Sequence, residues 1–251
     1  MGILSSVKGF FGTAGRFIAA GLSQLFGLGF ELTHRLPGLF GFFDYILGWI
    51  GIRPKMKLYL RVVVLVEGGS PIVADLDEVY SIINHAKSIF RSQANIDIVP
   101  VGASLLSVSP YNAPAAALDP NCGTDLWEDD FGEAGEFFRM HSVDTFLGSS
   151  TGYGSPITAF VVKKIWEGGF IKRGCSMALF EDYLLVSILG LNNPPSRVLA
   201  HELAHTCGLA VIDILHHSSE NNLMNVEGLS GVNLTNYQVA RLRNSPHVIP
   251  F

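Results

Sequence analysis

Two histidines four residues apart, with a glutamate directly after the first, restrict most strongly how this 251-residue chain can fold. The letters PPSRVLAHELAHTCG at 194–208 put prolines at the start of an apolar-periodic stretch and Gly208 at its end, which predicts a helix. Residues four apart on a helix share a face and lie about 6 Å apart along the axis. His201 and His205 can therefore place two imidazole nitrogens on one metal ion.

Glu202 lies beside this pair and need not bind the ion. A carboxylate at that place can accept a proton from a water activated by the metal, which is the chemistry that the H-E-x-x-H spacing serves in zinc hydrolases. A catalytic zinc usually has three protein ligands and a water. A third ligand must then lie elsewhere in the chain, and without one the site is degenerate and holds no metal.

The motif HELAHTCGL, followed by NNLMN at 221–225, resembles the signature of the metzincin clan of zinc metallopeptidases, which is H-E-x-x-H-x-x-G-x-x-H and then a methionine turn. The resemblance implies a zinc endopeptidase that acts on peptide or protein substrates. It also implies these roles: His201 and His205 as zinc ligands, Glu202 as general base, Gly208 as the turn glycine, and Met224 as the methionine beneath the metal.

The third histidine of the family pattern is displaced, because Val211 stands at its expected place and cannot bind zinc. Family members often carry this histidine in strings such as H-x-x-D-x-N-x-L-M. Counting back from Met224 by that pattern reaches His216, so we predict His216 as the third ligand. His217 and Asp213 remain alternatives.

Helix geometry adds a condition to this prediction. In an unbroken helix His216 would lie about 16 Å along the axis from His205, too far to share an ion. Gly208 must therefore end the helix and let the chain fold back. By the same comparison, AVIDI at 210–214 is an insertion before the ligand loop.

Residues 54–251 alternate strand-like and helix-like patterns, which predicts an α/β (α+β) domain. The metzincin layout implies a mixed twisted sheet, an active-site helix, a methionine turn and a C-terminal helix, with 175–180 as the antiparallel edge strand that binds an extended peptide. Residues 107–155 look irregular apart from a short helix near 129–140. The predicted strands are 57–67, 95–106, 156–165, 175–180 and 183–189, and the predicted helices are 75–93, 194–208 and 234–244.

Residues 1–53 form a hydrophobic, amphipathic N-terminal segment that differs from the rest of the chain. The mean hydropathy of +0.34 is high, and most of the apolar excess precedes Pro54. Arg16 and Asp44 interrupt its apolar runs, which argues against a membrane-spanning helix and a standard secretory signal. Two interpretations remain: a segment that lies on a membrane surface, or an arm packed on the following domain or on a partner protein.

Charge and cysteine content limit the function further. The net charge of −5, without a basic stripe, argues against nucleic-acid binding. Cys122 and Cys175 could form a disulfide, although three reduced core cysteines fit equally well, and Cys207 is expected to be a packed thiol. A membrane-associated or exported protein is favoured over a cytoplasmic one. The alternative to a peptidase is a membrane- or partner-binding protein whose metal site is structural or degenerate.

Overall fold

The computed structural model describes most of the chain after residue 45, and all the described residues belong to the compact unit Phe40–Phe251. Residues 1–45 of the predicted N-terminal segment lie outside this description, as do Val211 and Asp213. The described residues are 46–48, 50–68, 72–122, 132–143, 154–176, 181–191, 196–209, 216–225 and 231–250.

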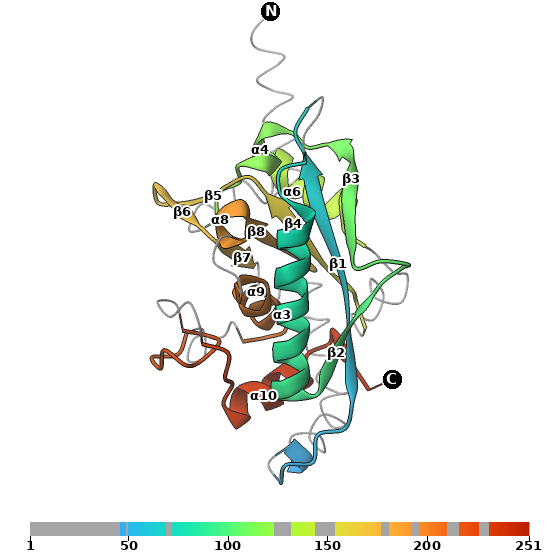
Figure 1. Cartoon of the computed structure of the whole chain (residues 1–251), viewed down its shortest axis with the longest axis vertical. Coiled ribbons are helices and arrows are strands. Elements are labelled where there is room, and N and C mark those ends of the chain that lie inside the picture. The colour runs from blue at the N-terminus through green and yellow to red at the C-terminus, as the bar shows by residue number, and fades with distance from the viewer. Residues whose placement is uncertain are drawn as a thin grey trace, which may run out of the picture. The chain divides into compact units, whose positions relative to one another are not determined.

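A mixed, mostly parallel β-sheet forms the centre of the domain (Figure 1). Within the described residues the strand order is β2-β1-β4-β8-β7, and β3 and β9 also pair with β1. Strand β7 pairs antiparallel with β8 and β9 antiparallel with β1, while the other pairs are parallel. The strands are β1 Met56–Val66, β2 Ile96–Pro100, β3 Leu106–Asn112, β4 Ile157–Val162, β7 Gly174–Ser176, β8 Tyr183–Ser187 and β9 Val248–Ile249. Strands β5 Ile165–Glu167 and β6 Phe170–Lys172 form a separate hairpin.

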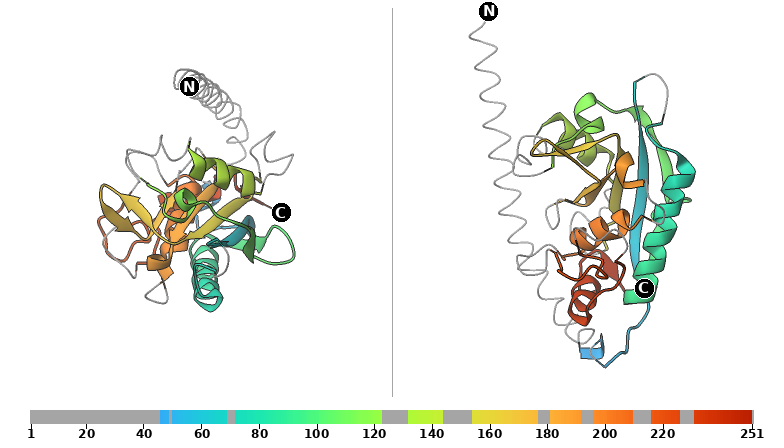
Figure 2. Two further views of the ribbon diagram at one scale, coloured as in Figure 1. Left: turned by 90° about the horizontal axis from the view of Figure 1, so that it is seen from above. Right: turned by 60° about the vertical axis from the view of Figure 1, so that its left-hand side comes forward.

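Helices cover both faces of this sheet, which is why β1 is a nearly continuous run of β-branched and aliphatic residues. Val62 and Val64 belong to one buried cluster, and Val63 and Leu65 belong to the other. Helix α3 runs along β1 on the first side (Figures 1 and 2). The helices are α3 Leu76–Ala94, α4 Ala115–Leu118, α6 Glu133–His141, α8 Ile188–Leu191, α9 Val198–Thr206 and α10 Asn236–Arg243.

The long predicted strand 95–106 is wrong, because the chain forms two strands there. Strand β2 pairs with the first half of β1, and β3 pairs with its second half after a short step at 101–105. Pro100 ends β2 and has no amide hydrogen with which to continue the ladder. The irregular stretch predicted from residue 107 is wrong for the same reason, since 107–112 belong to β3.

The predictions of helices at 75–93 and 234–244 are confirmed by α3 and α10, and α9 occupies the later part of the predicted helix 194–208. A helix near 129–140 is confirmed by α6, in the part of that stretch that is described. None of the helices in the described ranges is long and apolar enough to cross a membrane.

Two of the three cysteines are joined, since Cys122 and Cys175 form a disulfide with a Cα–Cα distance of 6.3 Å. The bridge attaches β7 to the segment that follows α4. Cys207 is a buried thiol, as expected, and burial raises its pKa to about 12.

Candidate metal centre

Helix α9 presents His201 and His205 on one face and ends at Thr206, two residues before the glycine at which the sequence predicts the end. The Gly208 amide donates to His205 O (2.9 Å) and the next amide donates to Ala204 O (3.0 Å), the paired bonds of a Schellman motif. Gly208 adopts φ +100°, a left-handed conformation in which a residue with a Cβ atom is strained. The glycine therefore lets the chain turn away from the helix directly after the second histidine.

Three imidazoles meet beside this helix. The Nε2 atoms of His201 and His205 lie 3.1 Å apart, and His216 completes a group whose ligand atoms all lie within 4.8 Å of one another. Two nitrogens bound to one tetrahedral zinc at about 2.0–2.1 Å would lie roughly 3.3 Å apart. Hence His201, His205 and His216 can hold a metal ion.

The other nitrogens of the first two imidazoles bind backbone carbonyls. His201 Nδ1 lies 2.8 Å from Leu223 O, and His205 Nδ1 lies 3.0 Å from Leu209 O. A carbonyl only accepts, so each Nδ1 donates and each Nε2 carries a lone pair directed into the group. Two lone pairs at 3.1 Å repel each other, and a cation between them relieves the repulsion. This arrangement fits metal-binding histidines, whose second nitrogen usually donates to a carbonyl or carboxylate.

Burial keeps both rings neutral. It is the largest cause that lowers the pKa of His201 to about 4 and that of His205 to about 3. Burial also lowers the pKa of His216, which is more exposed than the other two. Neutral imidazoles at pH 7 keep their lone pairs available for a metal.

Glu202 follows His201 on helix α9 and is buried, with 6% of its surface exposed. Burial raises the pKa of its carboxyl to about 8, and the positive charges of Lys172 and Arg197 oppose that shift in part. A perturbed carboxyl next to a group of potential metal ligands is typical of catalytic sites.

The turn at 222–225 lies next to the imidazoles and buries Met224 completely. The side-chain oxygen of Asn222 accepts from the Met224 amide (2.8 Å), and the His217 amide donates to Met224 O (2.9 Å). His217 is thus held by its backbone, while its Nδ1 accepts from the Ser219 amide (3.1 Å). His216, and not His217, joins the three-imidazole group.

Arg197 is a site residue that the sequence did not reveal. Its guanidinium is buried and donates to the carbonyls of Leu223 and Asn225, so it fastens helix α9 to the turn that carries Met224. The one signal in the sequence is its position four residues before His201, on the same helix face.

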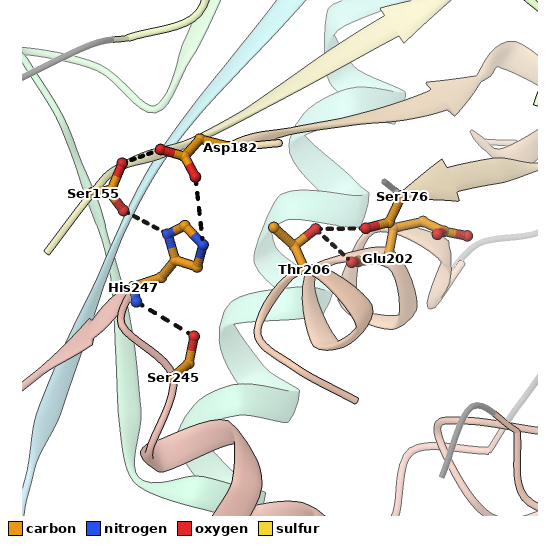
Figure 3. A network of polar contacts seen from close by, with 7 residues as sticks. All are labelled: Ser155, Ser176, Asp182, Glu202, Thr206, Ser245 and His247. Carbon is orange, nitrogen blue, oxygen red and sulfur yellow. Dashed lines mark hydrogen bonds and ion pairs between the residues drawn. The ribbon is translucent and has the colours of Figure 1, made fainter. Parts of the chain in front are cut away.

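His247 is another buried histidine and is not a member of the three-imidazole group (Figure 3). His247 Nδ1 donates to the backbone oxygen of Ser155 (2.9 Å), and its Nε2 lies 3.7 Å from Asp182. The Ser155 hydroxyl donates to Asp182 and not to the imidazole, so this is no serine–histidine nucleophile pair. His247 is a buried histidine whose ring nitrogens lie near Ser155 and Asp182.

Comparison with models of known protein families gave no match, and comparison with curated protein sequences gave none either.

Proposed function

We propose that the chain is a zinc-dependent endopeptidase of the metzincin type. The observation that supports this most is the group formed by His201, His205 and His216, with the buried Glu202 on the same helix as the first two. Structural zinc sites usually have four protein ligands, whereas catalytic sites have three and leave a position open for water.

The donor set favours zinc over the harder divalent cations. Three neutral imidazoles suit zinc and other transition metals, while magnesium and calcium prefer oxygen ligands. The two Nδ1–carbonyl bonds fix the rings so that Nε2 faces the ion. Zinc bound there would supply a Lewis acid that lowers the pKa of a coordinated water and polarises the scissile carbonyl.

Glu202 would move the protons. Burial raises the pKa of Glu202, and a zinc ion held by the imidazoles would favour its carboxylate form. The carboxylate then takes a proton from the attacking water and gives it to the leaving nitrogen of the peptide bond. The water oxygen bonds to the carbonyl carbon and the C–N bond breaks. The products are a carboxylic acid and an amine, and the acid then gives its proton to the amine.

Strand β7 suits an extended substrate. It pairs antiparallel with β8 at one end of the strand order in the described sheet. A peptide that adds to such an edge gains backbone hydrogen bonds, which gives affinity for extended chains of varied sequence. The Cys122–Cys175 disulfide supports an exported or membrane-associated location, because such bonds persist in oxidising compartments.

The test is peptide hydrolysis and zinc content of Glu202→Ala against wild type. We expect zinc to be retained and the rate to fall by a factor on the order of 10²–10⁴, because the base is lost and the ligands remain. Glu220→Ala is the matched control, since Glu220 is an exposed acid between His216 and Met224.

Turnover of Glu202→Ala within about twofold of wild type would refute the assignment of the base. Wild-type protein that binds zinc but cleaves no peptide would favour the alternative, a membrane- or partner-binding protein with a structural metal site.

A further inference from the structure

Strand β7 lies against helix α9, and its alternating side chains divide between two faces. Gly174, Cys175 and Ser176 pair with Val186, Leu185 and Leu184 of β8. Cys175 forms the disulfide with Cys122 on one face, in the second buried cluster. Gly174 and Ser176 therefore face the other way, toward α9.

The position of β7 relative to α9 is fixed by hydrogen bonds close to Glu202 (Figure 3). The hydroxyls of Ser176 and Thr206 lie 2.8 Å apart, and the Thr206 hydroxyl donates to the backbone oxygen of Glu202 (3.0 Å). The disulfide and the ladder with β8 hold the strand from its other sides. The strand has little freedom to move away from the helix.

Gly174 lies where Glu202 comes closest to this strand. A Cβ atom added at Gly174 would lie 2.6 Å from Glu202 Oε1, 2.7 Å from its Cγ and 2.9 Å from its Cδ. Carbon–carbon contacts are optimal near 3.5–4.0 Å, so no side chain fits while the carboxylate stays in place. The backbone of Gly174 does not have a positive φ, so its conformation suits any residue. The need for glycine comes from the close approach of Glu202.

We infer that Gly174 is a positioning residue for Glu202, an inference that rests on the proposed function for its catalytic consequence. The carboxyl of Glu202 packs against the backbone of β7 at Gly174, where no side chain intervenes. A methyl group at this place displaces the carboxyl, because the strand is fixed and the side chain is the part that can rotate. The three atoms nearest to the added Cβ all belong to Glu202, and none belongs to His201, His205 or His216.

The first measurement is peptide hydrolysis by Gly174→Ala, with zinc content determined on the same sample. We expect zinc to be retained and kcat to fall by roughly 10- to 100-fold with a smaller change in KM, because misplacement of a reacting group by about 1 Å has effects of this size. Gly102→Ala is the control, since a Cβ there meets nothing within 4 Å. An unchanged kcat in Gly174→Ala would overturn the inference.

The second measurement is a double-mutant cycle with Glu202→Ala, followed by thermal unfolding as well as by activity. If Gly174 acts through Glu202, Gly174→Ala lowers Tm in the wild-type background and lowers it much less when residue 202 is already alanine. Equal Tm losses in both backgrounds would overturn the inference. Should wild-type protein cleave no peptide, the proposed function fails by itself, and the coupling in Tm still decides whether Gly174 places Glu202.

Discussion

At the scale of single residues, the carbonyl of Leu223 connects the turn at 222–225 to helix α9 in the candidate metal centre. Leu223 O accepts from His201 Nδ1 (2.8 Å) and from the guanidinium of Arg197, which also donates to Asn225 O. Three hydrogen bonds thus hold the turn at 222–225 to the start of helix α9. Burying a cation destabilises the folded protein unless its hydrogen bonds are made. The hydrogen bonds of Arg197 must therefore contribute more to stability than an exposed ion pair does.

Arg197→Leu should therefore destabilise the protein by about 1–3 kcal/mol, because buried carbonyls lose charged donors. It should also weaken zinc binding, since the orientation of His201 depends on Leu223 O. Urea unfolding and a competitive zinc titration measure the two effects. Arg91→Leu is the control: its side chain is 53% exposed, and its ion pair with Asp97 should contribute less than about 1 kcal/mol. Equal losses in the two variants would contradict this account of Arg197.

The residues with fixed local spacing could be predicted from the sequence, and the others could not. His201, Glu202 and His205 follow from one helical motif, and counting back from Met224 selects His216, which lies in the three-imidazole group. Arg197 and Gly174 act through contacts with residues 26 to 28 positions away. No local pattern records such contacts, because they arise only when the sheet, the helix and the turn have packed together.

At the scale of elements, the start of helix α10 is connected to the turn at 222–225. Thr235 and Gln238 form a capping box, in which each side chain accepts a hydrogen bond from the other residue's backbone amide. The Gln238 side chain also exchanges two hydrogen bonds with Asn222 (2.8 and 3.2 Å), whose oxygen accepts from the Met224 amide. One side chain therefore both caps the helix and holds the turn.

This dual role predicts different results for the two members of the capping box. Thr235→Ala should cost about 0.5–2 kcal/mol of stability, the usual effect of losing a cap, and leave zinc affinity unchanged. Gln238→Ala should cost at least as much and also weaken zinc binding, because Asn222 loses its partner. Urea unfolding and zinc titration of both variants test this. Zinc affinity equal to wild type in both would show that the turn does not depend on Gln238.

Sequence periodicity predicted the long elements and missed the short ones. Helices α3 and α10 have caps and apolar spacing that mark their ends. Strand β9 has two residues, too few for any alternation, and it exists because it pairs with the start of β1. The division of one predicted strand into β2 and β3 likewise depends on β1, which is long enough to pair with both.

At the scale of the whole molecule, the contacts of Arg53 indicate where the folded domain must begin. Its guanidinium donates to Gln93 O (2.7 Å) and to the Asn236 side chain (2.9 Å), and its own carbonyl accepts from Asn95 (2.7 Å). These bonds join the chain before β1 to α3 and α10. A shortened protein should therefore keep Arg53.

A chain that begins at Ile50 should fold with the Tm and zinc content of the full-length protein, because it keeps these contacts. We expect the full-length protein, and not the shortened one, to float with liposomes, since the apolar excess lies before Pro54. Equal flotation of the two proteins would contradict the membrane interpretation. Retention of a partner protein by the full-length chain alone, without flotation, would favour the other interpretation of residues 1–53.

The most direct test of the central claim is the zinc content of purified protein after dialysis, compared for wild type, His216→Ala and His217→Ala. His216 joins His201 and His205 in the candidate centre, whereas the neighbouring His217 binds the Ser219 amide. Loss of one of three ligands should lower zinc affinity severely. We predict about one zinc per chain in wild type and in His217→Ala, and almost none in His216→Ala. Wild-type protein without zinc, or a site emptied by His217→Ala and full in His216→Ala, would contradict the account.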